Sequence, residues 1–368
     1  MKILFYNDPQ LEFGGAETYW HDTAYFLVKN GVEVQKLSFE PDQNQHTWFS
    51  KVAHGPIVEQ FCQAVRQFKP DLIHLNKNLL YAAGIKKALQ KVNLPTIATV
   101  HDYYTIPFAI NGRNHLKKRL FPFRICAQVH IVPSCHYYSK LKKHGVSDIH
   151  YIPHFVHPEK WTFNENYEGT GKKLLYVGRL EKQKGIWVLL EAMRILIKHD
   201  PGLQLIIIGQ GSLERQIRSF LAHAGLHKQV VLAGGKQHHE VRQYFEQATL
   251  LIMPSIEDEM LGLVGLEAQA SGLPVIASDL AGIREWCRHQ ATGWTVKPGH
   301  AFELAQAIRH LLADPLLRQN LRHQARVQVA REFDVGVSIQ SLIRLYRQII
   351  QSRQEIPVST LVQAIPST

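Results

Sequence analysis

Short apolar runs alternate with longer amphipathic stretches along this chain, and after a break near residue 165 the alternation starts again. The runs are rich in Val, Ile and Leu, a composition typical of parallel strands in sheets that are covered on both faces. The first series of predicted strands comprises Lys2–Tyr6, Glu33–Phe39, Asp71–Leu75, Thr96–Val100, Gln128–Val132 and Ile149–Ile152. The second comprises Lys173–Val177, Leu203–Ile208, Val230–Ala233, Leu250–Met253, Val275–Ala277 and Gly293–Val296. This repeated alternation predicts an α/β protein made of two Rossmann-like domains.

Helical periodicity fills most of the intervals between these strands. The predicted helices include Gly15–Lys29, Val58–Phe68, Gly185–Lys198, Ser212–Ala224, Ala301–Leu312 and a last periodic segment, Val335–Ile350. The polar stretch from Thr162 to Lys173 has neither periodicity, so the domain boundary is expected there. We therefore expect a first domain over 1–165, a second over 166–335, a helix over 336–352 that packs back toward the first domain, and a frayed tail over 353–368.

The composition narrows the class and the location of the protein. Hydrophobic residues make up 45% of the 368 residues, enough for two buried cores. The opening MKILFYNDP is too short an apolar run for a signal peptide, and no stretch approaches the roughly 20 apolar residues that span a bilayer. The four cysteines form no CxxC pair, so we expect a reduced, cytoplasmic protein without disulfides or a zinc site. The adjacent His238 and His239 suit a solvated loop better than a metal site.

The net charge is +11, and one segment is unusually basic. Between Tyr103 and Ser147 there is no acidic residue but there are eight Lys or Arg, with aromatic and leucine side chains interleaved. Such a surface suits an anionic lipid, an anionic acceptor or nucleic acid. An ordinary basic face of a basic protein explains the segment equally well, so these interpretations stay open at this point.

The residues that follow each predicted strand are candidates for a site, because ligands of open α/β sheets bind beyond the carboxyl ends of the strands. Gly14 and Gly15 precede the first helix, whose N-terminus favours an anion. His101 follows the fourth strand and can donate to a phosphate or a sugar hydroxyl. A plain strand–helix turn and a structural histidine are the alternative readings of these two features.

Two cations lie in GRLEKQKG, the loop after the first strand of the second domain. Arg179 and Lys184 can hold a diphosphate there and stabilise its charge as it departs, although they could also be solvated charges. The next strand is followed by Gly209-x-Gly211, which lacks the third glycine of the dinucleotide-binding fingerprint. A dinucleotide oxidoreductase is therefore disfavoured.

The densest stretch is PSIEDEMLGLVGLEAQASG, where two carboxylates bracket a small apolar run. Glu259 is predicted in a loop and Glu267 inside the following helix, Gly262–Ser271. Between them, the amides of Gly262, Leu263 and Val264 can face a phosphate. One carboxylate can then bind sugar hydroxyls on one side of a diphosphate, and the other a ribose diol on the other side.

The pattern PS-x-x-x-E followed by GLV-x-LEA resembles the signature of the retaining GT-B glycosyltransferases, specifically glycosyltransferase family 4. Other motif residues stand in family order, and the resemblance extends from about Met1 to Ile350. These are Gly14-Gly15-Ala16-Glu17, His101-Asp102, Pro133-Ser134, Gly178-Arg179, Lys184-Gly185, Gly209-x-Gly211, and Gly282 with Glu285. The resemblance implies a GT-B fold whose two Rossmann-like domains face a central cleft, with the acceptor on the first domain and the nucleotide-sugar donor on the second.

The resemblance also implies roles for single residues. The catalytic candidates are His101 on the donor sugar or its leaving phosphate, Arg179 and Lys184 on the diphosphate, and Glu259 on a sugar hydroxyl. The donor-binding candidates are Gly15 and Gly209, the backbone near Lys236 at the base, Gly262, Leu263 and Val264 at the phosphate, and Glu267 at the ribose. The chain departs from the family pattern at 153–157 and at Ala281, so no role is transferred to 153–157.

The expected activity is transfer of a hexose from a nucleotide-diphosphate sugar with retention of anomeric configuration and without a metal or other cofactor. UDP-glucose is the first expected donor and GDP-mannose the second. The expected acceptor is a saccharide or a polyprenyl-linked saccharide in exopolysaccharide or cell-envelope synthesis, with the protein at the inner face of the membrane. Nucleic acid is then a disfavoured partner. A nucleotide-sugar-binding protein without transfer activity is the alternative.

Overall fold

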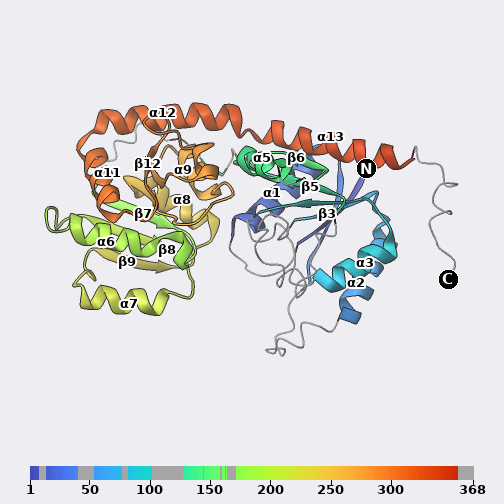
Figure 1. Cartoon of the computed structure of the whole chain (residues 1–368), viewed down its shortest axis with the longest axis horizontal. Coiled ribbons are helices and arrows are strands. Elements are labelled where there is room, and N and C mark those ends of the chain that lie inside the picture. Colours follow the sequence, from blue (N-terminus) through green and yellow to red (C-terminus); the bar gives the residue numbers. More distant parts are fainter. Residues whose placement is uncertain are drawn as a thin grey trace. The chain divides into compact units, whose positions relative to one another are not determined.

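The computed structural model describes residues 1–7, 14–39, 54–76, 82–101, 127–143, 145–157, 160–161, 163 and 171–354. The chain divides into two compact units, which are described separately here: unit 1 is Met1–Pro153 with Gly336–Thr368, and unit 2 is His154–Val335. Each unit holds one six-stranded sheet in which all described strand pairs are parallel. The predicted α/β class with two Rossmann-like domains is therefore confirmed (Figure 1).

The sheet of unit 1 has the order β2-β1-β3-β4-β5-β6. Its strands are β1 (Lys2–Tyr6), β2 (Glu33–Leu37), β3 (Leu72–Leu75), β4 (Thr96–Thr99), β5 (Val129–Val132) and β6 (Ile149–Tyr151). Its described helices are α1 (Gly15–Lys29), α2 (His54–Phe68), α3 (Ala82–Val92), α5 (Cys135–Lys143) and α13 (Val335–Gln354). Each strand predicted for this unit exists, and the ends differ by no more than two residues.

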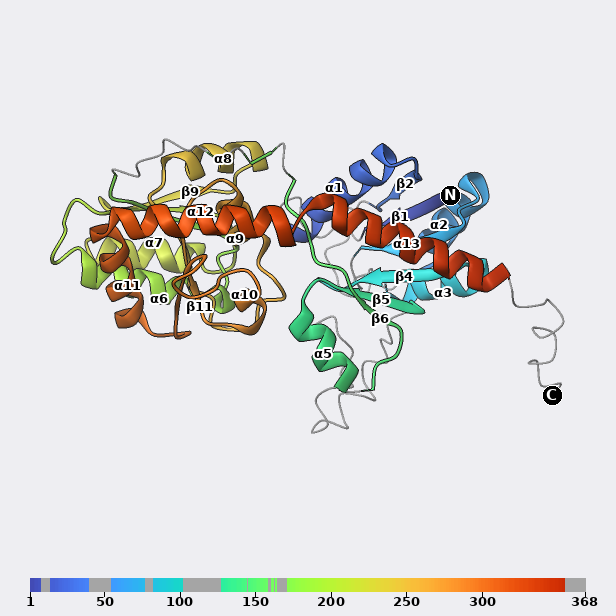
Figure 2. The same cartoon turned by 90° about the horizontal axis from the view of Figure 1, so that it is seen from above.

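The two faces of this sheet are covered by different helices, because successive side chains of a strand point to opposite faces. Leu4 and Tyr6 of β1 pack with the residues of α2 and α3. Phe5 points the other way, where it packs with Trp20 of α1 and stacks on the ring of His74 from β3. The C-terminal helix α13 covers this second face, where Tyr346 contacts His74 (Figure 2).

The sheet of unit 2 has the order β12-β11-β10-β7-β8-β9. Its strands are β7 (Lys173–Val177), β8 (Gln204–Ile208), β9 (Val230–Gly234), β10 (Leu250–Met253), β11 (Val275–Ser278) and β12 (Trp294–Val296). Its helices are η3 (Lys182–Lys184, a 3-10 turn), α6 (Ile186–Leu196), α7 (Glu214–His223), α8 (His238–Gln247), α9 (Leu263–Ala270), α10 (Ala281–Arg284), α11 (Ala301–Ala313) and α12 (Pro315–Glu332). One core lies under α6, α7 and α11, and a second under α8, α9 and α12.

Strand order reverses direction once in each sheet, and this reversal positions the candidate residues. In unit 1 the reversal lies at β1, which pairs with both β2 and β3. In unit 2 it lies at β7, which pairs with both β8 and β10. Crevices at the carboxyl ends of such strands are where ligands bind in open α/β sheets. Residues that follow β1, β3, β7 and β10 are therefore the candidates for ligand contacts.

Helix α12 is absent from the helices predicted from the sequence. Its buried face holds three polar residues, Arg318, Arg322 and Gln328, beside three apolar ones, Leu321, Ala325 and Val329. Arginine side chains of this helix bind main-chain carbonyls. Arg322 Nε donates to Gly272 O at 2.9 Å, and Arg326 Nη1 donates to Ala270 O at 3.0 Å. The start of α12 does carry a sequence signal, since Asp314 accepts from the amide of Leu317 and proline follows it at the first helical position.

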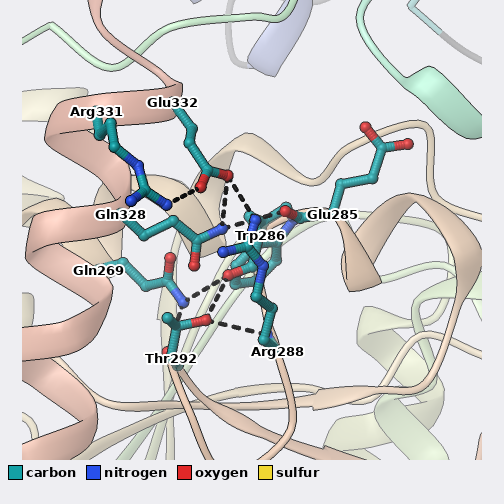
Figure 3. Close-up of polar contacts among 8 residues, drawn as sticks. All are labelled: Gln269, Glu285, Trp286, Arg288, Thr292, Gln328, Arg331 and Glu332. Carbon is teal, nitrogen blue, oxygen red and sulfur yellow. Dashed lines mark hydrogen bonds and ion pairs between the residues drawn. The ribbon is translucent and has the colours of Figure 1, made fainter.

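A cluster of polar contacts ties the C-terminal part of α12 to the segment that follows α10 (Figure 3). Gln328 Nε2 donates to the main-chain oxygen of Glu285 at 3.1 Å, and Arg288 pairs with Glu332 at 2.7 Å. On the other side, Gln269 of α9 donates to the carbonyl oxygen of Thr292 at 2.7 Å. These hydrogen bonds fix α9, α10 and α12 to one another.

The units divide after Pro153, earlier than the boundary expected at 165. The amide of Val156 donates to Phe333 O at 3.3 Å, and Trp161 packs against Phe245 of α8, so this segment belongs to unit 2. Residues 162 and 164–170 of the expected break lie outside the described residues. Over the described part of the chain, none of the helices combines the length and the apolar character needed to cross a membrane.

Candidate functional site

Lys184 and Glu259 meet at the carboxyl ends of β7 and β10. Lys184 Nζ lies 2.5 Å from Glu259 Oε1, and Ser255 Oγ donates to the same oxygen at 2.7 Å. The two side chains of the ion pair are 26% and 12% exposed, so the pair is mostly shielded from water. The residues are 75 positions apart in sequence and meet because β7 and β10 are neighbours. The sequence predicted both residues for one site but not that they would be paired.

The close approach of the two loops depends on Gly185. This residue has a φ of 69°, and a Cβ atom on it would lie 1.7 Å from the carbonyl oxygen of Pro254. The amide of Ile256 donates to Gln183 O at 2.9 Å, which fastens the loop after β10 to η3. Only glycine permits this contact, since any side chain would both clash and strain the left-handed backbone.

Arg179 is the second residue after β7, and its side chain is exposed. Its main-chain oxygen accepts a hydrogen bond of 2.9 Å from the hydroxyl of Tyr176. Burial of Tyr176, together with the nearby charge of Glu259, raises the pKa of this phenol well above its ordinary value. Tyr176 therefore stays neutral and supports the turn that carries Arg179. Glu257 and Asp258 are exposed, as expected for acids outside the site.

The N-terminus of α9 lies between the two predicted carboxylates. Gly262 precedes the helix with a φ of 81°, and the amides of Leu263 and Val264 belong to its first turn. The first-turn N–H groups of a helix have no partner within the helix, so they are suited to an anion. Glu267, one turn further along, is 8% exposed. The predicted order of loop carboxylate, helix start and buried carboxylate is therefore present.

Glu267 is joined to the loop after β9 by a histidine that the sequence did not single out for the site. His238 Nε2 lies 3.2 Å from Glu267 Oε1, and the ring of His238 packs edge-on against Trp161. His238 is the first residue of α8, so the expectation that His238 and His239 lie in a loop is wrong. Glu240 Oε2 accepts from the amide of Gln237 at 2.8 Å, which stabilises the start of the helix at this point.

Lys236 lies in the loop between β9 and α8, two residues before His238, and its ammonium pairs with Glu240 at 3.4 Å. Lys236, which was predicted to border the base, is therefore only two residues from His238, which contacts Glu267. Gly209 follows β8 with a φ of 143°, and a Cβ on it would lie 1.9 Å from Gly178 O. The absence of a side chain at Gly209 is therefore required by the packing of two main chains.

In unit 1, His101 follows β4 and is joined to the ends of two other strands. Its Nε2 lies 3.0 Å from Asn76 Oδ1, and Asn76 Nδ2 donates to Asn7 Oδ1 at 2.9 Å. Asn76 follows β3 and Asn7 follows β1, so this chain of polar groups lies at the reversal point of the sheet. The ring of His101 also packs edge-on against Tyr19 of α1. Sequence reasoning missed Asn76, although it directly follows a predicted strand.

Gly15 is the first residue of α1, as predicted. The carboxylate of Glu17 folds back toward the start of this helix, so that a Cβ on Gly14 would lie 2.5 Å from Glu17 Oε2. The carboxylate of Glu17 thus lies near the N-terminus of α1, where the sequence predicted that Gly15 would contact a phosphate. Asp102 and residues 103–126 of the basic stretch lie outside the described residues.

The described residues contain no cluster of three or more His, Cys, Asp or Glu that could hold a metal ion. In the loops after β7 and β10, the ion pair is the one between Lys184 and Glu259.

Two family models match consecutive parts of the chain. The model described as Glycosyltransferase Family 4 matches residues 13–160, and the model described as Glycosyl transferases group 1 matches residues 158–328. The first match falls mainly on unit 1 and the second on unit 2. Together they cover α1 and the loops after β3, β7 and β10.

Curated relatives carry related names. The amylovoran biosynthesis glycosyltransferase AmsK of Erwinia amylovora is 31% identical over 182 residues, 48% of this chain and 45% of the relative. The glycogen synthase of Mycobacterium tuberculosis is 28% identical over 286 residues, 73% of this chain and 66% of the relative. These matches span between about half and two thirds of the length of the relatives.

Solved structures share the fold over nearly the whole chain. Sucrose-phosphate synthase from Thermosynechococcus elongatus has a TM-score of 0.81 at 22% identity and covers 95% of this chain and 99% of its own. HepE of Anabaena, solved with UDP-glucose, has a TM-score of 0.74 at 19% identity and covers 97% of this chain and 100% of its own. The fold is the GT-B fold of two Rossmann-like domains, and the chain belongs to the glycosyl transferases group 1 family, that is, to glycosyltransferase family 4.

Proposed function

We propose that the protein transfers a hexose from a nucleotide-diphosphate sugar to a saccharide or lipid-linked saccharide. The observation that carries this proposal is the meeting of Lys184 and Glu259 at the carboxyl ends of β7 and β10. The N-terminus of α9 follows the same loop, and the buried Glu267 follows it in turn. A cation, a set of amides and two carboxylates in this order suit a nucleotide, its diphosphate and its sugar.

In the proposed complex, Lys184 leaves Glu259 for the diphosphate and Arg179 adds the second positive charge. Glu259 is then available to accept hydrogen bonds from a sugar hydroxyl, and Ser255 keeps its carboxylate in place. The two cations neutralise the departing diphosphate, which is why we propose transfer without a required metal. Glu267 accepts from the ribose hydroxyls, and the loop at Lys236 borders the base.

We further propose that transfer retains the anomeric configuration. The acceptor hydroxyl oxygen forms the new bond to the anomeric carbon on the face from which the bond to the phosphate oxygen breaks. The proton of that hydroxyl passes to the departing phosphate oxygen, so the products are the glycoside and the nucleoside diphosphate. His101 is assigned to the donor sugar or the departing phosphate.

UDP-glucose is the donor we propose first and GDP-mannose second. HepE was solved with UDP-glucose, and a phosphatidyl-myo-inositol mannosyltransferase of Mycobacterium leprae is 31% identical over 195 residues. The name of AmsK places that relative in the biosynthesis of amylovoran, which supports an exopolysaccharide or cell-envelope product here. We propose a cytoplasmic location at the inner face of the membrane.

The deciding experiment measures nucleotide release from a panel of UDP-, GDP- and ADP-sugars, with EDTA present and no acceptor added. We expect slow hydrolysis of one donor, which would identify the base and the sugar. Lys184→Met should abolish this release. Hydrolysis of no donor, together with no protection against thermal unfolding by UDP, GDP or ADP, would contradict the proposal and favour a binding protein without transfer activity.

Membrane association is tested separately, on the described part of the basic stretch. Helix α5 carries Lys140, Lys142 and Lys143 and no acidic residue. We expect replacement of these three lysines by serine to weaken sedimentation with vesicles rich in anionic lipid. The matched control replaces the three lysines of α3 in the same unit, Lys86, Lys87 and Lys91. Equal loss in both variants would indicate net charge alone, and unchanged binding of the α5 variant would contradict the proposal.

A further inference from the structure

Three strands of unit 1 end in polar residues that form one connected chain. Asn7 follows β1, Asn76 follows β3 and His101 follows β4. The side-chain amide of Asn76 makes three hydrogen bonds: Nδ2 donates to Asn7 Oδ1 and to Ala16 O, each at 2.9 Å, and Oδ1 lies 3.0 Å from His101 Nε2. Asn76 is fully buried and Asn7 is 3% exposed.

The orientation of the Asn76 amide follows from one of these partners. A main-chain carbonyl can only accept, so the atom that faces Ala16 O must be the amide nitrogen. Turning the amide over would set Oδ1 against that carbonyl oxygen and leave both without a donor in a buried position. Such a loss costs more than an ordinary hydrogen bond contributes. The amide nitrogen of Asn76 therefore donates its two protons to Asn7 Oδ1 and Ala16 O, and the amide oxygen faces His101.

The protonation of one ring nitrogen of His101 follows in turn. Asn76 Oδ1 has no proton to give, so the ring nitrogen opposite it must be the donor. The neutral ring therefore carries its proton on Nε2, and Nδ1 is its acceptor atom. Hydrogen bonds made by one ring nitrogen decide the state of the other in this way throughout proteins.

We propose that Asn76 is a positioning residue that fixes His101 as the Nε2-protonated tautomer and so makes Nδ1 the atom with which the neutral ring accepts from a donor-sugar hydroxyl. The second half of this inference rests on the proposed function, which assigns His101 to the donor. The first half rests on the hydrogen bonds of Asn76 alone. Asn7 and Ala16 act through Asn76, because they consume the two protons that would otherwise compete for the ring.

The first half is tested on the full-length wild-type protein by two-dimensional NMR of histidine labelled with ¹⁵N. The signals of His101 are identified by their absence in His101→Gln, and the long-range couplings of the ring protons show which nitrogen carries the proton. We expect the Nε2-protonated neutral form. A wild-type ring protonated on Nδ1 would overturn the inference without any variant of Asn76.

A substitution at Asn76 then tests this positioning. Asn76→Leu removes the oxygen opposite Nε2, so the Nδ1-protonated form should appear and kcat for donor hydrolysis should fall about tenfold, the factor for one hydrogen bond. The matched control is Tyr346→Phe, which removes another buried hydrogen bond of unit 1, the contact of 2.6 Å with His74. It should leave both the tautomer of His101 and kcat unchanged.

The outcomes distinguish this inference from the proposed function. An unchanged tautomer in Asn76→Leu would overturn the role of Asn76. A changed tautomer with unchanged kcat would overturn the role of Nδ1 in the reaction. If wild-type protein hydrolyses no nucleotide sugar, the proposed function fails, and the wild-type tautomer still decides the first half.

Discussion

Polar side chains of the two units are held by different kinds of interaction. In unit 1, His101 is bound by the amide of Asn76, and His74 by the hydroxyls of Tyr346 and Thr99. In unit 2, Lys184 is bound by the carboxylate of Glu259, and His238 by that of Glu267.

This difference matters because the two kinds of interaction respond differently to a ligand. The amide of Asn76 and the hydroxyls of Tyr346 and Thr99 are already hydrogen-bonded to these partners, so a ligand gains little by displacing them and the side chains stay in place. An unpaired charge in a shielded site is costly, so Lys184 and Glu259 neutralise each other until a diphosphate and a sugar replace the partners. Unit 1 therefore presents fixed groups, and unit 2 presents charges that exchange partners.

The largest expected effect is a fall in kcat when either member of the Lys184–Glu259 pair is replaced. Lys184→Met and Glu259→Gln should each lower kcat about 10²–10³-fold, the loss typical for removal of one preorganised group that stabilises developing charge. Steady-state release of the nucleotide measures this, with circular dichroism to verify the fold. The control is Arg194→Met, in an exposed ion pair of α6. Normal turnover in both variants would show that the site lies elsewhere.

The second prediction concerns pH and the neutral network of unit 1. Burial lowers the pKa of His74 from 6.5 to about 3, so the folded protein keeps this ring neutral. The unfolded chain binds a proton below pH 6.5, and stability is therefore lost as the pH falls from 6.5 toward 3. Relative to His74→Gln, the wild type should lose about 2 kcal/mol of unfolding free energy between pH 7 and pH 4.5. Urea denaturation at the two pH values measures this loss.

The control for the pH prediction is His227→Gln, at an exposed histidine. This variant should lose the same stability on acidification as the wild type. If the stability of His74→Gln depends on pH as that of the wild type does, His74 is not the group responsible for the loss of stability on acidification. The contrast drawn between the two units would then fail.

The third prediction measures the pairing of Lys184 with Glu259 in the absence of a ligand. Each of Lys184→Met and Glu259→Gln should destabilise the protein by about 1–2 kcal/mol, because the remaining partner loses its counter-charge in a shielded position. The double variant should lose less than the sum, with a coupling of about 1 kcal/mol. Unfolding in guanidinium chloride measures the unfolding free energies of the four proteins in this double-mutant cycle.

The same cycle on Glu191 and Arg194 is the control for this pairing. Their side chains are 42% and 53% exposed, so their coupling should stay below about 0.5 kcal/mol. Equal couplings for the two pairs would mean that the site pair is as weakly held as a surface pair, and the contrast between the units would fail.

The smallest expected effect is on donor affinity through Glu267. His238→Ala removes the contact of 3.2 Å that holds this carboxylate, so the KM for the donor should rise about 3- to 10-fold with kcat nearly unchanged, the size of a weak hydrogen bond. His239→Ala, at the exposed neighbouring residue, is the control. A loss of kcat without a change in KM would show that His238 acts elsewhere than on the ribose side.

Much of the local structure could be predicted from the sequence. The strands Lys2–Tyr6, Lys173–Val177 and Leu250–Met253 have the predicted bounds, because continuous apolar runs between turn residues are a local signal. The periodicity of helix α12 was missed, because Arg318, Arg322 and Gln328 are buried beside the three apolar residues of its inward face and interrupt the apolar pattern. The PS-x-x-x-E pattern and the glycines around it identified the family, which two consecutive family models confirm.

The sequence by itself therefore determined the class and the two-domain organisation and supplied the candidate residues of the site, since these follow from short-range patterns. Only the tertiary structure decided which loops meet. Lys184 and Glu259 pair across 75 residues because β7 lies beside β10, and Asn76 reaches His101 because β3 lies beside β4. Strand order depends on the packing of whole helices against a sheet. A hydrogen bond between the ends of two strands therefore cannot be predicted from the sequence of either segment alone.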